Sequence, residues 1–564
     1  MSVAVQDVGG TRRVSVVGDL TDPADGQALL EALAGRGTGP LELTFYDART
    51  LPGEVLEKLL GLRADAPPLK IYAYHGYLLH HLVRLGLPVL GMFPAGASPA
   101  AHEYAAVVLG GSADSLDKIL AIVEALPPSQ ATVFIVQHIL EDKPNYLDRL
   151  LRMRTEYAVE MPQHLTEIRP GSIYVAPPEH HMRVAHGRIY LTHDRKVNYA
   201  RPSIEVLFES VAGEYKERCL GALLCGYGRD GVAGLAAIKA GGGCALIENS
   251  ADCAARDLTD AAIAGGGFDH VLSLPELRCY VAAAVAGRNN QPSQQLIALL
   301  LEAVYSRYGY DYRNYQQGTV ERRLANLYAK VAAEDFFALQ REILTDPDAF
   351  EHLFLELSIN ITAFFRHPKQ FKVLRERVLP YLDSFPHIKI WSAGCAAGEE
   401  AYSLAILLDE LGMLHKSLIF ATDINPYQLE EAKNGLYPIE TLEEGRRNYA
   451  ASGGRGRLEK WLTVEKGYVK IAPRLSQKML FYPHSLAHDG PFNEFQLIVC
   501  RNVLIYFHPA LQQRVMDLFS RSLHRDGFLM LGPSEETGPG GGARFFEPYA
   551  AAGKIYRWDG KGPH

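Results

Sequence analysis

The sequence predicts an α/β protein of several domains. Apolar runs that suit buried strands alternate with stretches that carry apolar residues at helical spacing, and this alternation recurs through most of the 564 residues. At about 150 residues per domain, this length suggests three or four domains. Hydrophobic residues at 48% and charged residues at 22% are typical of folded globular chains and exclude global disorder.

Two segments divide the chain. Residues 93–100 are small and punctuated by proline, and residues 287–294 are polar without an apolar period. We therefore expect one domain over 1–92, a second over 104–286 and a third that begins at 295. The third starts with helices over 295–385 and continues as an α/β segment over 386–558.

Composition narrows the functional class. The net charge of -8 argues against nucleic acid as the main partner, because proteins that bind it are more often basic. Seven scattered cysteines with no CxxC pair disfavour a disulfide framework and a zinc ribbon. The sequence starts without the features of a signal peptide, and no apolar run reaches the roughly 20 residues of a membrane helix. We expect a soluble cytoplasmic protein without a metal and without membrane insertion.

The first domain is predicted to be a small α/β sandwich. Strands are expected over 13–17, 41–46 and 69–74, and helices over 25–33, 54–62 and 77–85. Three histidines, His75, His80 and His81, suggest a metal site, but no carboxylate or cysteine is spaced to complete it. Packing or surface roles are therefore the preferred interpretation.

The sequence Phe45-Tyr46-Asp47, followed by a helix, resembles the STAS fold, although Ala48 stands where that family has a phosphorylatable serine. A receiver domain would instead need an adjacent acidic pair after its first strand. Asp19 and Asp47 are isolated, and only three strands are clear. We expect a regulatory or docking module that is not phosphorylated and acts through protein contact.

Three strands of the middle segment end in residues with complementary chemistry. Strands expected over 106–109, 133–136 and 221–224 lead to Ser112, His138 and Asp230. Carboxyl ends of parallel strands open on one edge, so these side chains can meet there. A histidine activates a serine by taking its proton, and an aspartate orients the histidine. The alternative is that Ser112 only caps a helix expected over 116–126.

Longer motifs run through this segment in a fixed order. They are Leu109-Gly110-Gly111-Ser112-Ala113, Val136-Gln137-His138, residues 170–178 with His181, residues 201–208, and Gly226-Tyr227-Gly228-Arg229-Asp230-Gly231. With these motifs, residues 104–286 resemble the catalytic domain of the chemotaxis protein-glutamate methylesterase family (CheB). The resemblance implies a doubly wound parallel sheet and an esterase whose triad is Ser112, His138 and Asp230.

The segment departs from that family at three places. Asp114 and Ser115 replace a usual glycine pair, Cys225 and Tyr227 are unusual before the aspartate motif, and residues 256–258 replace a Gly-Met-Pro element. A carboxylate at Asp114 would oppose an oxyanion unless it points away or is paired. The alternative to an active esterase is an inactive docking or regulatory module.

The last segment is predicted to begin with helices and continue as α/β. Helices are expected over 296–307, 320–331 and 336–344, and Arg313, Arg322 and Arg323 form either a solvated face or a docking patch for an acidic helix. A strand over 387–391 leads to a turn with Gly394 and a helix over 401–411.

A second strand of this segment, over 418–421, precedes Asp423, and a third, over 495–500, precedes Arg501. An acid at the end of the second strand suits ribose hydroxyls. The glycine turn lacks the Lys-Ser/Thr pair of a phosphate cradle, so a nucleoside cofactor without phosphates fits better than ATP.

Residues 295–558 resemble the chemotaxis protein-glutamate O-methyltransferase family (CheR). The resemblance rests on residues 358–366, 391–404, 421–424, 500–507 and 531–535. It implies a Rossmann-like domain that binds S-adenosylmethionine, with Arg366, Arg501 and Tyr506 as catalytic residues. Arg501, Asn502 and Tyr506 would line the site near the transferred methyl group. Ser485 is a departure, because asparagine is usual near the adenine. The residues expected from this resemblance to bind the cofactor are Asn360, Thr362, Arg366, Gly394, Glu399, Asp423, Ser485, Arg501 and Asn502.

The two resemblances together imply opposing activities in one chain. One domain would form glutamyl methyl esters on the cytoplasmic helical region of chemoreceptors, and the other would hydrolyse them. The alternative is a one-way methyltransferase with an inactive esterase-like domain.

Overall fold

The computed structural model describes residues 2–8, 11–17, 23–34, 40–45, 48, 51–64, 69–73, 78, 81–82, 85, 87, 89–91, 104–112, 114–138, 146–287, 292–331, 333, 335–358, 362–465, 467–538 and 544–558. The chain divides into two compact units. The first unit holds residues 1–94, 314–323 and 351–564, and the second holds 95–313 and 324–350.

The amino-terminal segment forms a five-stranded sheet with the order β1-β2-β3-β4-β5. Strand β1 pairs antiparallel with β2, and the remaining neighbours are parallel. The expectation of three strands was wrong, because β1 and β5 were missed. β1 is an edge strand with a partly exposed pattern, and β5 has only three residues. The elements are β1 (Ser2–Val8), β2 (Thr11–Val17), α1 (Pro23–Ala34), β3 (Leu41–Phe45), α2 (Gly53–Ala64), β4 (Leu69–Ala73) and β5 (Val89–Gly91).

Side chains of this sheet domain contact the carboxyl-terminal part of the same unit. His81 Nδ1 lies 2.7 Å from Glu431 Oε1, and both side chains are buried. Leu436 and Tyr468 belong to the buried apolar cluster of the sheet domain. His81 therefore has a packing role. His75, His80, Asp19 and Asp47 lie outside the described residues, as does most of the helix expected over 77–85.

The middle segment contains the expected doubly wound sheet. Its seven strands have the order β15-β14-β13-β6-β7-β10-β8, and all pairs are parallel. The strands expected over 106–109 and 133–136 are confirmed as β6 (Ala106–Gly111) and β7 (Thr132–Gln137), and the strand expected over 221–224 as β13 (Cys219–Leu223). The other strands of the sheet are β8 (Ala158–Glu160), β10 (Ser172–Val175), β14 (Cys244–Glu248) and β15 (His270–Leu272).

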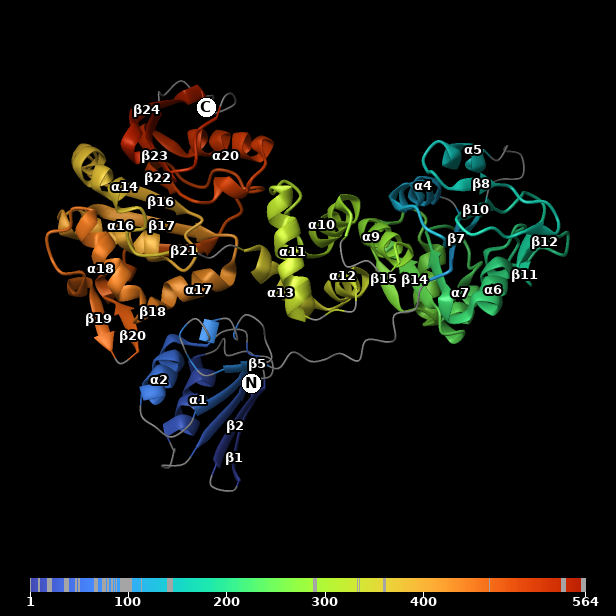
Figure 1. Cartoon of the computed structure of the whole chain (residues 1–564), viewed down its shortest axis with the longest axis horizontal. Coiled ribbons are helices and arrows are strands. Elements are labelled where there is room, and N and C mark those ends of the chain that lie inside the picture. The colour runs from blue at the N-terminus through green and yellow to red at the C-terminus, as the bar shows by residue number, and fades with distance from the viewer. Residues whose placement is uncertain are drawn as a thin grey trace. The chain divides into compact units, whose positions relative to one another are not determined.

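Helices cover both faces of this sheet. A Cβ on Gly110 would meet Ile204 of α6, whereas a Cβ on the next residue, Gly111, would meet Ser115 at the start of α4. Because successive strand residues face opposite sides, α6 and α4 lie on opposite faces. Figure 1 shows α6 beside α7. The helices are α4 (Leu116–Ala125), α5 (Leu147–Arg152), α6 (Ile204–Tyr215), α7 (Val232–Ala240), α8 (Asp257–Gly265) and α9 (Leu274–Val285).

A small antiparallel sheet of order β11-β12-β9 accompanies the large one. It was not predicted, because its strands are short and partly exposed. It consists of β9 (Thr166–Glu167), β11 (His181–Ala185) and β12 (Arg188–Thr192).

The helices expected after residue 295 are present. Arg313 donates two hydrogen bonds to Asp311 and lies 4.0 Å from the centre of the Tyr305 ring. Arg323 Nη1 lies 3.6 Å from Glu356 Oε1, and Arg322 is exposed. Two of the three arginines therefore have partners within their own units. The helices are α10 (Gln294–Tyr308), α11 (Gln317–Val331), α12 (Phe336–Thr345) and α13 (Pro347–Leu357).

The carboxyl-terminal sheet has the order β21-β17-β16-β22-β23-β25-β24. The first five strands are parallel, and β25 and β24 are antiparallel additions at one edge. The expected strands are confirmed as β16 (Ile388–Ala393), β17 (Ser417–Asp423) and β22 (Phe495–Cys500), and the remaining ones are β21 (Met479–Pro483), β23 (Leu523–Leu531), β24 (Phe546–Ala550) and β25 (Ile555–Trp558).

Helices α16 and α17 pack against β17 (Figure 1). A three-stranded sheet of order β18-β20-β19 follows α17. These elements are α14 (Pro368–Val373), α15 (Leu379–Leu382), α16 (Glu399–Glu410), α17 (Pro426–Asn434), β18 (Leu436–Pro438), α18 (Thr441–Ala451), β19 (Leu462–Glu465), β20 (Tyr468–Ile471), α19 (Pro473–Ser476) and α20 (Pro509–Ser522). Among the helices of the described residues, none combines the length and the apolar character that crossing a membrane requires.

Candidate active sites

The sheet of the middle domain brings His138 and Asp230 together. His138 follows β7, Asp230 lies in the loop after β13, and β6 lies between these two strands. His138 Nε2 is 2.9 Å from Asp230 Oδ2. The Asp230 side chain is 3% exposed and that of His138 is 19% exposed. A buried carboxylate thus orients a partly accessible imidazole.

Asp230 lies at the amino terminus of α6. Its Oδ2 accepts from the Ile204 amide at 2.7 Å, and its Oδ1 accepts from the Ser203 hydroxyl at 2.7 Å. Burial raises the pKa of Asp230, but the hydrogen bonds from His138 and Ser203 and the charge of His138 outweigh burial and hold the pKa below its ordinary value of 3.8. The carboxylate is therefore ionised and fixed, as an orienting acid must be.

Ser112 lies beside this pair on the same edge. Its amide donates to Cys225 O at 3.0 Å, and the amide of His138 donates to Gly111 O at 3.0 Å. A Cβ on Gly226 would lie 2.3 Å from Ser112 Cβ, so only glycine allows this approach. The residue at the cap position of α4 is Ser115, whose hydroxyl donates to Ser112 O. Ser112 is therefore not the residue that caps this helix.

Asp114 does not carry an isolated charge. Its Oδ2 lies 3.8 Å from Lys118 Nζ and accepts from the Ala254 amide at 3.2 Å. The carboxylate is thus paired, which weakens the argument that it would oppose an oxyanion at Ser112. Residues 255–258 also support the site, because Gly226 N donates to Ala255 O and Leu258 N donates to Gly226 O.

One group of possible metal ligands occurs among the described residues. Ligand atoms of Cys225, Glu248 and Cys253 lie within 4.8 Å of one another. Lys118 Nζ lies 2.6 Å from Glu248 Oε1 and contacts Cys253 Sγ at 3.9 Å. A lysine ammonium therefore already neutralises the carboxylate of this group.

In the carboxyl-terminal domain, Asp423 ends β17 at the carboxyl edge of the sheet, opposite the turn that follows β16. It accepts hydrogen bonds from the amides of Ala396 at 2.8 Å and Asn425 at 2.9 Å. Burial raises the pKa of Asp423, and the backbone amides offset this only in part. Gly394 and Gly398 have φ values of 76° and 93°, which favour glycine in the turn.

The polar groups of this edge suit the nucleoside part of a cofactor. The His484 amide donates to Asp423 O at 3.0 Å, which places Ser485 near Asp423. The buried Ser485 hydroxyl makes no hydrogen bond to the described residues, so it remains available to a ligand. A carboxylate and a free hydroxyl match ribose and adenine better than phosphates.

Arg501 lies in a buried polar network below this edge. Its guanidinium donates to Gln370 Oε1 at 3.0 Å, to Glu400 Oε2 at 3.1 Å and to the backbone oxygen of Arg366 at 2.5 Å. The Arg501 side chain is 1% exposed. Burial and the charges of Arg501 and Arg366 lower the pKa of His367.

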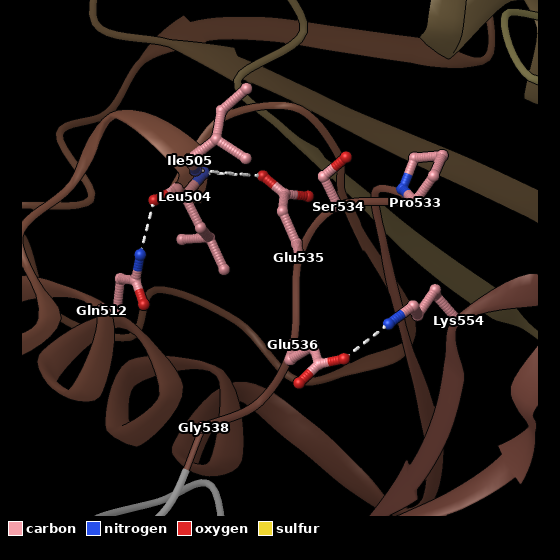
Figure 2. Close-up of a pocket in the computed structure, with 9 residues that line it drawn as sticks. All are labelled: Leu504, Ile505, Gln512, Pro533, Ser534, Glu535, Glu536, Gly538 and Lys554. Carbon is pink, nitrogen blue, oxygen red and sulfur yellow. Dashed lines mark hydrogen bonds and ion pairs between the residues drawn. The ribbon is translucent and has the colours of Figure 1, made fainter. Parts of the chain in front are cut away.

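Glu535 organises the loop that contains Asn502. Its Oε1 accepts from the amides of Val503 and Leu504, each at 2.8 Å, and its Oε2 accepts from those of Asn502 at 3.0 Å and Gly532 at 2.6 Å. Figure 2 shows the carboxylate directed at this backbone, beside a cavity of about 340 Å³. One buried acid therefore fixes the loop.

Three of the remaining predicted residues, Glu399, Thr362 and Tyr506, belong to the described part of the chain. Glu399 is buried at the first position of α16. Thr362 is partly exposed, and Tyr506 accepts a hydrogen bond from the Gln316 amide through its backbone oxygen. Asn360 lies outside the described residues.

Sequence reasoning did not assign roles to the residues that hold the site residues in place. Glu535, Gln370 and Glu400 hold the 501–505 loop and Arg501, and Ser203 holds Asp230. Glu535 and Ser203 lie within the family motifs quoted above, and this position was the sequence signal that could have pointed to them. Gln370 offered none, because it lies 131 residues from its partner.

The fold and the two sites define a methyltransferase of the nucleoside-cofactor type joined to an esterase-like α/β domain. Three family models match the chain. CheB methylesterase matches residues 107–281, the all-alpha domain of CheR methyltransferase matches 295–358, and the SAM binding domain of CheR methyltransferase matches 360–544.

Relatives agree with these matches. The putative methyltransferase Cher3 of Pseudomonas putida is 41% identical over 261 residues, which cover 46% of this chain and 96% of that protein. A chemotaxis protein methyltransferase of Listeria innocua is 33% identical over 232 residues, covering 40% of this chain and 85% of that protein. The chain belongs to the CheR methyltransferase family, carries a CheB methylesterase domain as well, and uses S-adenosylmethionine as its cofactor.

A solved structure is also similar. The catalytic domain of CheB methylesterase from Thermotoga maritima matches with a TM-score of 0.30 and 26% identity. The match covers 32% of this chain and 97% of that domain.

Proposed function

We propose that the chain methylates glutamate side chains of chemoreceptors in the cytoplasm and also hydrolyses the resulting methyl esters. The observation that carries the second activity is the His138–Asp230 pair at the sheet edge that holds Ser112. The first activity is supported by the CheR matches and by Asp423 beside the glycine turn.

Methyl transfer requires few catalytic groups from the protein. A glutamate carboxylate is ionised at neutral pH and is itself the nucleophile, so no general base is needed. Bound S-adenosylmethionine supplies an electrophilic methyl group on a sulfonium. The protein contributes positioning and exclusion of water. Asp423 and Ser485 would hold the nucleoside, with Thr362, Glu399 and the motif residue Asn360.

Arg501 is better suited to positioning than to substrate contact. Its donors are directed at Gln370, Glu400 and the Arg366 backbone. We therefore propose that Arg501 fixes the segment bearing Arg366, while the Arg366 side chain, Asn502 and Tyr506 face the acceptor carboxylate and the methyl group. An arginine held away from the nucleophile also leaves the carboxylate more reactive.

Ester hydrolysis follows from the bonding of His138. Because Nε2 bonds to Asp230, Nδ1 is the nitrogen that can take the Ser112 proton. Ser112 Oγ bonds to the ester carbonyl carbon, and methanol leaves with that proton. Water activated by His138 then cleaves the acyl-enzyme, which releases the glutamate side chain and restores Ser112.

The alternative of an inactive esterase domain rests on the departures near Ser112. The pairing of Asp114 with Lys118 weakens the electrostatic part of that alternative. A synthetic helical peptide carrying one glutamyl γ-methyl ester separates the two. The full chain should release methanol from this peptide, and Ser112→Ala should reduce the rate by several orders of magnitude. Equal rates for both proteins would support the inactive domain.

We propose that the amino-terminal domain regulates or docks through protein contact. Support comes from its buried contact with the transferase part of the unit, where His81 pairs with Glu431. Helix α17, which bears Glu431, begins directly after the Asp423 loop.

A further inference from the structure

Two exposed tyrosines stand at the edge that carries the predicted triad. Tyr199 is 97% exposed and Tyr227 is 64% exposed, and no other aromatic side chain among the large apolar residues of the described chain is exposed as fully. Tyr199 therefore gains almost no stabilisation from burial, and Tyr227 is only partly covered. Packing in the core therefore does not account for the choice of tyrosine at either position.

Each tyrosine is next to a residue that touches the triad. Asn198 Nδ2 donates to Asp230 Oδ1 at 3.3 Å, and Tyr199 follows it directly. Tyr227 follows Gly226, whose missing side chain lets the backbone approach Ser112. Tyr199 thus directly follows a residue bonded to the aspartate, and Tyr227 directly follows a residue packed against the serine.

The backbone at Tyr199 is unfavourable for a tyrosine. Val197 and Ala200 exchange backbone hydrogen bonds of 3.2 and 2.9 Å, which closes a tight two-residue turn. Asn198 has a φ of 48° and Tyr199 a φ of 67°, a left-handed pair in which glycine or asparagine is preferred. A bulky residue in this region costs conformational energy and recurs at functional sites. Stability alone would select glycine here.

The charges around the two rings favour an acidic ligand. Arg195, Lys196 and Arg229 are exposed in the same two loops with one exposed acidic side chain, Asp194, whereas the acidic Asp230 of the second loop is buried and bonded to His138. A helix that offers glutamate side chains on one face would meet these charges, while its aliphatic stems would lie on the rings.

We propose that Tyr199 and Tyr227 form a clamp that binds a glutamate-rich amphipathic helix of the protein substrate and presents its methyl ester to Ser112. The clamp rests on the proposed esterase function and adds the residues that recognise the substrate. Tyr199 and Tyr227 are specificity-determining residues and take no part in bond breaking.

Binding and hydrolysis are measured separately to test the clamp. Fluorescence anisotropy follows binding of the labelled methyl-ester peptide to the full chain in which Ser112→Ala prevents turnover. In this background, a second substitution, Tyr199→Ala or Tyr227→Ala, should weaken peptide binding about fivefold or more. Tyr199→Phe should change the affinity by no more than about twofold, because it keeps the ring.

Leu165→Ala is the matched control. Leu165 is also exposed, at 46%, and also has a positive φ, of 71°. Its amide donates to Ile189 O near the start of β12, whereas Tyr199 follows the other end of that strand, at Thr192. The Leu165→Ala variant should bind the peptide as tightly as the parent does. Tyr199→Gly should weaken binding while its thermal midpoint stays equal or rises, because glycine relieves the backbone.

Unchanged peptide binding in both alanine variants, or no binding by the parent, overturns the clamp. A fall in thermal midpoint of Tyr199→Gly with unchanged binding overturns it too and makes Tyr199 structural. If binding depends on the tyrosines but the chain with Ser112 intact releases no methanol, the clamp stands and the esterase function fails. If the chain releases methanol but peptide binding does not depend on the tyrosines, the esterase function stands and the clamp fails.

Discussion

Asp230 shows how much of the esterase site depends on one side chain. It accepts hydrogen bonds from His138, Ser203 and the Ile204 amide while it is almost fully buried. A group whose pKa is lowered by folding stabilises the fold above its unfolded pKa, and this contribution disappears as pH falls through the folded pKa.

Asp230→Asn should therefore remove a stabilising contribution at neutral pH, of about 1–3 kcal/mol, because the donors around it lose a charged acceptor. The stability of the variant should also depend less on pH below 3.8, the ordinary value from which the pKa is lowered. Denaturant unfolding of the full chain between pH 7 and pH 3, followed for the transition of the middle domain, measures both. Parallel pH profiles for the two proteins would show that Asp230 is not charged in the native state.

Asp423 is the corresponding residue of the transferase site. Asp423→Ala removes a charged acceptor from the two ribose hydroxyls, which should cost roughly 1.5–3 kcal/mol and weaken the binding of S-adenosylhomocysteine about tenfold or more. Titration calorimetry on the full chain measures this, with Asp409→Ala, a partly exposed acid on α16, as a control. Equal affinity for Asp423→Ala and the parent would place the nucleoside elsewhere.

At the scale of elements, the loop after β22 is held by an acid from the end of β23. A Cβ on Gly532 would lie 2.5 Å from Glu535 Oε2. Because glycine has no side chain there, the Glu535 carboxylate can reach the loop. The loop carries Asn502 and Tyr506, which we propose to face the transferred methyl group.

Glu535→Gln should therefore lower kcat for methyl transfer more than it lowers cofactor affinity. An amide can accept fewer of the five backbone hydrogen bonds that Glu535 accepts. A displacement of about 1 Å near the reacting atoms costs about 100-fold in rate. Steady-state methylation and calorimetry with S-adenosylhomocysteine separate the two quantities. Equal losses in kcat and affinity would mean that Glu535 only supports cofactor binding.

Strand and motif patterns carried most of the prediction at this scale. The β6, β7 and β13 strands were predicted because buried parallel strands are continuous apolar runs, and their ends gave Ser112, His138 and Asp230. Strand β1 was missed because an edge strand with exposed alternate residues carries a weak signal. Contacts such as Arg501 with Gln370, 131 residues apart, depend on tertiary packing that no local pattern encodes.

The whole molecule combines a CheR methyltransferase part and a CheB methylesterase domain with an amino-terminal domain of a different topology. That domain has five strands, as a receiver would, but the order β1-β2-β3-β4-β5 and the antiparallel β1 differ from the doubly wound order of flavodoxin-like folds. The topology thus supports the prediction that this domain is not a phosphorylated receiver, although that prediction was first argued from a count of only three strands.

Incubation of the full chain with acetyl phosphate and magnesium should therefore give no acyl-phosphate adduct on the amino-terminal domain, because isolated aspartates do not bind the metal that such transfer needs. Intact-mass measurement before and after hydroxylamine detects an adduct. A stoichiometric, hydroxylamine-sensitive mass increase that Asp47→Ala abolishes would contradict the prediction.

The passage of one labelled methyl group through the chain tests the central claim most directly. The full chain is incubated with a cytoplasmic chemoreceptor fragment and S-adenosylmethionine labelled in the methyl group. The label should enter the fragment and then appear as volatile methanol. Ser112→Ala should keep the label on the fragment, and Asp423→Ala should incorporate little. Label that accumulates on the fragment without methanol, equally in the parent and Ser112→Ala, would contradict a chain that both forms and hydrolyses the esters.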